Sequence, residues 1–150
     1  MLNDNDRPYE IVVGVDGSEM SLEALAWAGD EAMRTGASLT AVMAWTFPNV
    51  WGPTPTWPPG MDPIEETRKQ LAQAVRSVLG KNRSLTVRES VIEGHAASVL
   101  IDAAQRADLL VVGRHGHTQV VGKLFGSISQ HCASHAPCPV TIVGPGTRKA

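Results

Sequence analysis

Short apolar runs alternate with stretches of helical periodicity along the chain. The apolar runs are rich in β-branched residues and are bounded by turn formers, which is typical of buried strands. They predict five strands, at about residues 11–15, 39–45, 85–92, 109–112 and 140–143. Strict alternation of strand and helix indicates right-handed crossovers around a parallel sheet.

Four stretches between these runs predict helices. In the first, apolar residues recur at helical spacing from Leu22, with Ser18 as the N-cap and Gly36 ending the helix. The second begins at Asp62-Pro63, an N-cap followed by an N1 proline, and runs to about Leu79. The remaining two cover residues 96–106 and 127–135.

This pattern predicts one α/β domain over residues 1–150, a doubly wound, Rossmann-like five-stranded parallel sheet of order 3-2-1-4-5 with four helices. Such a sheet places its ligand where the strand order reverses, beyond the carboxyl ends of strands one and four. Three segments fall outside the pattern. We expect a flexible arm at 1–8, a Pro/Trp-rich loop at 47–63 and a weakly patterned tail at 144–150.

Glycines mark the turn after the fourth strand. Gly113, Gly116 and Gly126-Ser127 follow the run 109–112 and directly precede the fourth predicted helix. Glycine lets a backbone turn sharply and bring its N–H groups close to an anion, and a helix N-terminus adds a positive dipole end. We therefore predict a phosphate-binding loop here.

Charge is distributed unevenly along a chain of net charge −2. No Asp or Glu follows Asp108, whereas Arg114, Lys123 and four of the five histidines do. This local excess of positive charge favours a small anion. A pI of about 6.2 and the lack of aromatic and basic residues interleaved on a strand argue against nucleic acid.

Other patterns bear on the compartment. No stretch approaches the ~20 apolar residues of a membrane span, and the acidic first residues do not resemble a signal peptide. Cys132 and Cys138 are too few for a disulfide scaffold or a paired zinc motif, so we interpret both as free thiols. We expect a cytoplasmic protein with no membrane partner.

The chain resembles the universal stress protein family. ATP-binding members carry Gly, two residues, Gly, nine residues and then Gly-Ser or Gly-Thr, and Gly113, Gly116 and Gly126-Ser127 match this spacing without a gap. The resemblance extends to residues 13–18 after the first strand and to residues 129–131 and 137–140 near the end. The full motif between a strand and a helix is a specific signal.

This resemblance implies an ATP-binding stress-response protein that regulates an unknown protein partner, with Mg²⁺ accompanying the nucleotide. It also implies a symmetric homodimer formed through the edge strand 140–143 (Val140–Val143). The implied adenosine side comprises Gly14, Val15, Asp16 and Ala44. The implied ribose and phosphate side comprises Gly113, Arg114, His115, Gly116, His117, Thr118, Gln119, Gly126, Ser127 and Ile128.

Several alternatives stay open from the sequence. A slow ATPase or nucleotidyl transferase on the same scaffold is the competing function, although no Walker Lys-Ser/Thr pair or second acidic metal ligand lies near the glycines. Asp16 could act only as an N-cap. His131 and His135, at i and i+4, could ligate a metal, but without an evident third ligand a structural role is favoured.

Overall fold

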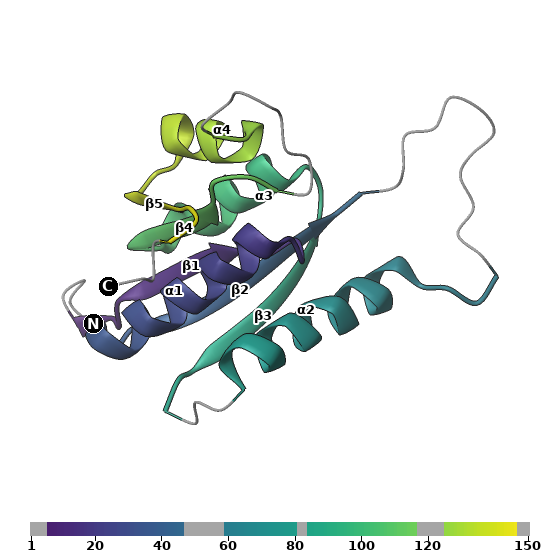
Figure 1. Cartoon of the computed structure of the whole chain (residues 1–150), viewed down its shortest axis with the longest axis horizontal. Coiled ribbons are helices and arrows are strands. Elements are labelled where there is room, and N and C mark those ends of the chain that lie inside the picture. Colours follow the sequence, from purple (N-terminus) through teal and green to yellow (C-terminus); the bar gives the residue numbers. More distant parts are fainter. Residues whose placement is uncertain (1–5, 47–58, 81–83, 117–124, 147–150) are drawn as a thin grey trace.

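The computed structural model describes residues 6–46, 59–80, 84–116 and 125–146 (Figure 1). The strands are β1 (Glu10–Gly14), β2 (Ser38–Trp45), β3 (Val87–Glu93), β4 (Leu109–Gly113) and β5 (Val140–Val143). The helices are α1 (Glu19–Thr35), α2 (Pro63–Leu79), α3 (Ala96–Ala103) and α4 (Ser127–His135). Strand and helix alternate throughout, as the hydrophobic pattern predicts.

All neighbouring strands pair in parallel, in the order β3-β2-β1-β4-β5. This confirms the predicted doubly wound sheet. The order reverses at β1, whose register places Val13 opposite Ala41 of β2 and Val111 of β4. The carboxyl ends of β1 and β4 therefore lie next to each other, and the turns that follow them meet at one edge of the sheet.

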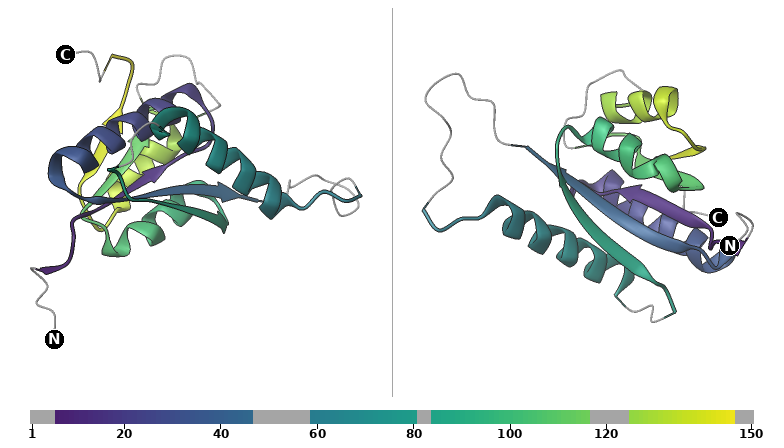
Figure 2. Two further views of the ribbon diagram at one scale, coloured as in Figure 1. Left: turned by 90° about the horizontal axis from the view of Figure 1, so that it is seen from below. Right: turned by 180° about the vertical axis from the view of Figure 1, so that it is seen from behind.

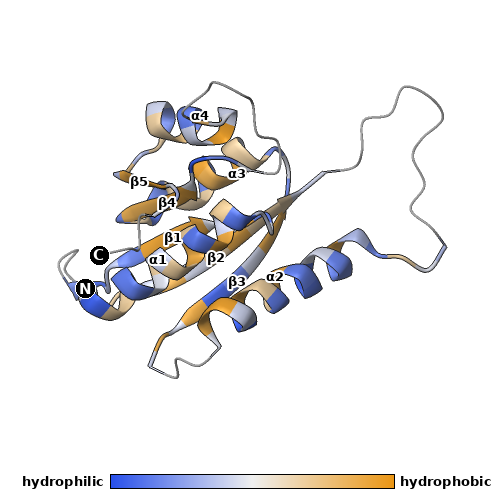
Figure 3. Cartoon of the chain, viewed as in Figure 1, coloured by the Kyte–Doolittle hydropathy of each residue, from blue (hydrophilic) through white to orange (hydrophobic). Residues whose placement is uncertain are grey.

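The helices cover the two faces of the sheet in pairs (Figure 2). Alternate strand residues such as Ile11 and Val13 pack with α1 and α2, while Val12 and Leu110 pack with α3 and α4. Figure 3 shows the corresponding apolar colouring along the central strands. Burial on both faces explains why β1 and β4 read as continuous apolar runs in the sequence.

Helix ends follow the predicted capping residues. The Ser18 hydroxyl accepts from the Ser21 N–H at the start of α1, and Gly36, at φ 73°, ends that helix in the left-handed conformation. At α2 the Asp62 carboxylate accepts from the Ile64 N–H, with Pro63 in the first turn. These caps bind backbone groups that a helix leaves without intrahelical partners.

Some boundaries differ from the sequence prediction. The third helix is α-helical only to Ala103, and residues 104–106 form a 3₁₀ turn closed by the Ala107 N–H and the Ala104 carbonyl (3.0 Å). Such tightening of a last turn is common at helix ends. β1 begins one residue early because the Glu10 carbonyl accepts from the Asp108 N–H (2.8 Å), which extends the sheet.

The predicted arm, Pro/Trp-rich loop and tail lie largely outside the described residues. Within the part of the chain that the structure describes, none of the helices combines the length and apolar character needed to cross a bilayer.

Candidate functional site

The turns after β1 and β4 meet beyond the edge of the sheet. A Cβ built on Gly116 would lie 2.8 Å from the Asp16 Oδ2 atom, although these residues are 100 positions apart in the sequence. The reversal of strand order next to β1 brings them together. A side chain at position 116 would occupy the space that the carboxylate uses.

A cavity opens between these turns. Its volume is about 70 Å³, and it is open to solvent. The two turns contribute Gly14, Val15, Asp16, Gly113, His115 and Gly116. The walls are completed by Ser21, Val42, Ala44, Ala96, Leu100, Val112 and Ile128.

Asp16 supports the start of α1 as well as lining the cavity. Its Oδ1 atom accepts from the Ser18 N–H (2.8 Å) and from the Ser18 hydroxyl. The Asp16 N–H in turn donates to the Ser21 hydroxyl (3.2 Å). Ser18, and not Asp16, is therefore the N-cap, and these bonds fix the carboxylate so that its other oxygen lies beside Gly116.

Backbone bonds hold the turn after β4 in place. The Arg114 N–H donates to the Val143 carbonyl of β5 (2.8 Å), and the Arg114 carbonyl accepts from the Gly126 N–H (2.7 Å). The buried Ser129 hydroxyl also donates to the Arg114 carbonyl (3.0 Å). Strand β5 and the start of α4 are thus tied to the same residue, one position before His115.

The N-terminus of α4 faces this turn without a side-chain cap. Its N-cap is Gly126, and the first intrahelical bond runs from the Gln130 N–H to the Gly126 carbonyl (3.1 Å). The N–H groups of Ser127 and Ile128 therefore have no acceptor within the helix. Open N–H groups and the positive end of the helix dipole together favour an anion.

Two buried polar atoms in the described residues have no hydrogen-bond partner, and they belong to consecutive residues of this turn. They are Arg114 Nε and His115 Nδ1. Buried donors without partners are uncommon because each one loses its bonds to water. His115 lines the cavity beside the uncapped start of α4, whereas Arg114 does not line it.

The predicted site residues fall into three groups. Eight line the cavity: Gly14, Val15, Asp16, Ala44, Gly113, His115, Gly116 and Ile128. Arg114, Gly126 and Ser127 do not line it, although Gly126 and Ser127 begin the helix beside it. His117, Thr118 and Gln119 lie outside the described residues.

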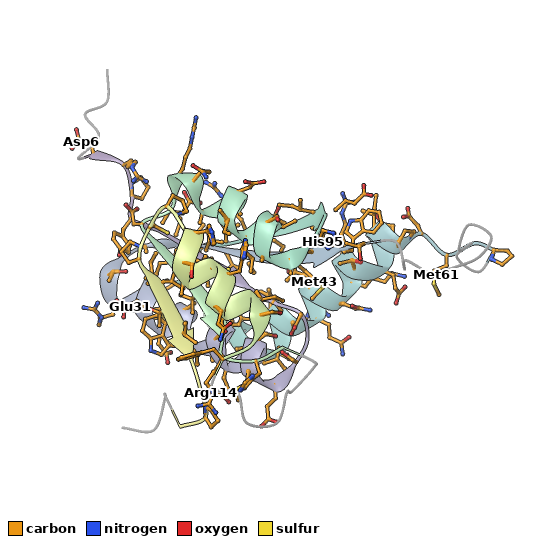
Figure 4. The ribbon with its side chains drawn as sticks, turned by 90° about the horizontal axis from the view of Figure 1, so that it is seen from above. Asp6, Glu31, Met43, Met61, His95 and Arg114 are labelled. Carbon is orange, nitrogen blue, oxygen red and sulfur yellow. The ribbon has the colours of Figure 1, made fainter. Side chains whose placement is uncertain are left out.

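The excess of positive charge after Asp108 suggests that the Arg114 guanidinium points into the cavity, but it does not. A Cβ built on Gly144 would lie 3.5 Å from an Arg114 guanidinium nitrogen, so the side chain runs toward the end of β5 (Figure 4). The described backbone of residue 114 shapes the turn, while its charge lies to one side of the cavity.

Sequence reasoning named Val15, Ala44 and Ile128 but missed the other apolar residues that line the cavity. Val42 lies opposite Gly14 in the β1–β2 register, and Leu100 packs over Gly14 from α3. A Cβ at position 14 would lie 2.7 Å from Leu100 Cδ1, so the absence of a side chain there admits Leu100 to the floor of the cavity. The β1–β2 register was the signal that could have identified Val42.

The described residues offer little for a metal held by the protein alone. No group of three or more His, Cys, Asp or Glu among them is arranged to hold an ion. His131 and His135 are exposed on α4 with their ring centroids stacked 4.4 Å apart. Burial raises the pKa of the Cys132 thiol, and burial with the nearby Asp108 raises that of Cys138. Both cysteines are free thiols and neither is activated as a nucleophile.

Comparison with known proteins identifies relatives. The model of the universal stress protein family matches residues 9–144. A universal stress protein of Mycolicibacterium smegmatis is 34% identical over 143 residues, which cover 94% of this chain and 47% of that protein. The chain thus spans about half the length of the curated relatives it matches.

Solved structures agree with this assignment. The universal stress protein UspA from Lactobacillus plantarum superimposes with a TM-score of 0.69 at 24% identity, covering 93% of this chain and 99% of that one. A universal stress protein crystallised in complex with cAMP superimposes with a TM-score of 0.64 at 28% identity. The match covers 91% of this chain and 96% of that one. With a family match over nearly all of its length and the family's sheet order, the chain belongs to the universal stress protein family.

Proposed function

We propose that this protein binds an adenine nucleotide, ATP in particular, in the cavity between β1 and β4, and acts as a nucleotide-dependent regulator in the stress response. The observation that carries the proposal is the meeting of Asp16 and Gly116 beside the uncapped start of α4. One wall of that cavity is apolar, and beside the other wall begins α4, whose first N–H groups have no acceptor within the helix.

The two ends of the cavity suit the two ends of a nucleotide. The apolar walls from Val42, Ala44 and Leu100 are suited to a flat base. An ionised Asp16 carboxylate accepts hydrogen bonds and donates none, so it suits a ribose hydroxyl and repels phosphate. The phosphates would then lie toward Gly113, Gly116 and the α4 N–H groups, where the dipole is favourable. The structural neighbour crystallised with cAMP supports an adenine nucleotide as the ligand class.

Magnesium fits this site only through the nucleotide. Among the described residues, Asp16 is the single carboxylate that lines the cavity. Mg²⁺ commonly binds through one or two carboxylates together with substrate phosphates and retained waters. A Mg²⁺ ion would therefore enter with the triphosphate and neutralise its charge.

Nucleotide occupancy gives a direct means of regulation, since a ligand that binds only the folded state stabilises it by mass action. We propose that this stabilisation orders the surfaces through which an unidentified partner protein is contacted. The two free cysteines suit a reducing compartment, and we therefore place the protein in the cytoplasm.

Thermal unfolding tests nucleotide binding. In the presence of Mg²⁺ and ATP at about a hundred times the Kd, the free energy of unfolding should rise by about 2.7 kcal/mol, which is several degrees in Tm. Differential scanning fluorimetry with ATP, ADP, AMP, cAMP and GTP measures both the shift and the base preference. A chain whose Tm moves with none of the adenylates, at millimolar ligand, lacks the proposed function.

We also propose that the protein forms a symmetric homodimer through β5. This strand is one of the two edges of the described sheet, and Val140 and Ile142 are only partly buried in the single chain. An apolar edge strand presents unpaired backbone groups that a second copy can bind. Size-exclusion chromatography with light scattering should give twice the 16.0 kDa of the chain, and Ile142→Lys should return the mass of one chain.

A further inference from the structure

Two serines at the start of α1 hold Asp16 from two directions. The Asp16 Oδ1 atom accepts from the Ser18 N–H (2.8 Å) and from the Ser18 hydroxyl. The Asp16 N–H donates to the Ser21 hydroxyl (3.2 Å), so the backbone of this residue is held as well as its side chain. Both serines are almost fully buried, at 8% and 5% exposure, although serine is ordinarily a surface residue.

Each of the two hydroxyls both donates and accepts within this turn. The Ser21 hydroxyl donates to the Ser18 carbonyl (3.0 Å), which can only accept, and it accepts from the Asp16 N–H, which can only donate. The Ser18 hydroxyl donates to the Asp16 carboxylate and accepts from the Ser21 N–H (3.4 Å). A helix cap requires only the last of these bonds. The others connect the cap to Asp16.

These bonds hold a carboxylate that lines the cavity. Asp16 and Ser21 both line it, and the Asp16 Oδ2 atom lies on the Gly116 side. A carboxylate on a freely rotating side chain loses rotamer freedom when it binds a hydroxyl, and it turns to water when the ligand has none. A carboxylate held by buried hydroxyls does neither. It therefore discriminates more strongly between a hydroxyl and a hydrogen at the same position of a ligand.

We propose that Ser18 and Ser21 are positioning residues for ribose recognition, whose hydroxyls hold Asp16 so that the cavity selects a ribonucleotide over the corresponding deoxynucleotide. The inference rests on the proposed function, in which Asp16 accepts from a ribose hydroxyl. It adds that two serines, acting through Asp16, set the degree of this selectivity.

The test measures a selectivity ratio, which is the affinity for ATP divided by the affinity for a deoxy analogue. Isothermal titration calorimetry with Mg²⁺ gives this ratio for 2′-deoxy-ATP and for 3′-deoxy-ATP, since Asp16 could accept from either hydroxyl. For the wild type the larger of the two ratios should be about tenfold, as expected for a hydrogen bond to a charged group. Asp16→Ala should bring it to about one.

Ser18→Gly removes the hydroxyl and keeps a favourable N-cap residue, so α1 is retained. We expect its selectivity ratio to fall to about threefold. Ser21→Ala, which removes the acceptor of the Asp16 N–H, should lower the ratio by a similar factor. Ser18→Thr keeps the hydroxyl and should retain the wild-type ratio. If Ser21→Ala does not fold, Ser18→Gly decides the question alone.

Asp62→Gly is the matched control, because it makes the same kind of change at the N-cap of α2, outside the cavity. It should leave the selectivity ratio at the wild-type value. The inference is overturned, and the proposed function stands, if Ser18→Gly binds ATP with the wild-type ratio, if Asp62→Gly lowers the ratio equally, or if the wild type binds ATP and both deoxy analogues alike. If the wild type binds no adenine nucleotide, both fall.

Discussion

Gly116→Ala should weaken nucleotide binding by about ten- to a hundredfold and leave the chain folded. The new methyl group would lie 2.8 Å from the Asp16 Oδ2 atom, closer than side-chain contacts allow. Asp16 cannot simply turn aside, because its other oxygen holds the N–H and hydroxyl of Ser18. Overpacking of this kind costs about 1–3 kcal/mol. We expect most of that cost to appear in the bound state, where the carboxylate and the turn both have to be in position.

A double-mutant cycle with Asp16→Ala isolates the contact. If the methyl group acts through the carboxylate, Gly116→Ala should cost little further affinity once Asp16 is alanine, so the two effects should be strongly non-additive. Gly29→Ala is a matched control. Gly29 lies in α1 away from the cavity, and a methyl group added there would meet only the tip of the Leu79 side chain of α2. Titration calorimetry of the four proteins measures the coupling. Additive losses would mean that the two turns do not meet.

Much of the fold could be predicted from the sequence because local signals agreed with one another. Helix boundaries were fixed by the N-caps Ser18 and Asp62 and by the left-handed Gly36. Burial on both faces of the sheet was indicated by the continuous apolar strands. The sheet order followed from the alternation of strands and helices, and the structure confirms it. One boundary moved because of a contact distant in sequence, where Asp108 extends β1, and another because of a local 3₁₀ turn at residues 104–106.

The sequence allowed the turn residues of the candidate site to be predicted, but not most of the apolar residues that form its walls. Asp16 and Gly116 follow strands whose neighbouring positions can be inferred from topology alone. Val42 and Leu100 belong to the interiors of a strand and a helix, where apolar residues are expected for packing and carry no special signal. The direction of the Arg114 side chain depends on the β4–β5 register, which places Gly113 opposite Val143. No local pattern encodes that register.

Gly14, Gly113 and Gly116 are required for the close approach of neighbouring groups and not for a left-handed backbone. A sharp turn predicts left-handed backbone, yet Gly14, Gly113 and Gly116 are not among the described glycines with positive φ. Each instead allows another group to approach closely: Leu100 at Gly14, the α1 backbone at Gly113 and the Asp16 carboxylate at Gly116. Glycine at these positions is thus a matter of packing, and the cost of replacing it depends on whether the neighbouring group can move.

Gly113→Ala tests that argument on stability and should lower the free energy of unfolding by about 2–3 kcal/mol. A Cβ there would lie 2.8 Å from the Met20 carbonyl carbon and 2.9 Å from the Met20 oxygen. These are backbone atoms of the first turn of α1, so relief requires the helix to shift away from the end of β4. Urea denaturation followed by circular dichroism gives the free energy from the midpoint and slope.

Gly14→Ala is the matched comparison, because Gly14 ends β1 as Gly113 ends β4. Its new methyl group would lie equally close, 2.7 Å, to Leu100 Cδ1, but that atom is the tip of a side chain that can change rotamer. We therefore expect Gly14→Ala to cost about 1 kcal/mol less than Gly113→Ala. If the two variants were equally stable, the backbone of α1 would not be pressing on the end of β4. The position of α1, and with it the placement of Asp16 against Gly116, would then need another explanation.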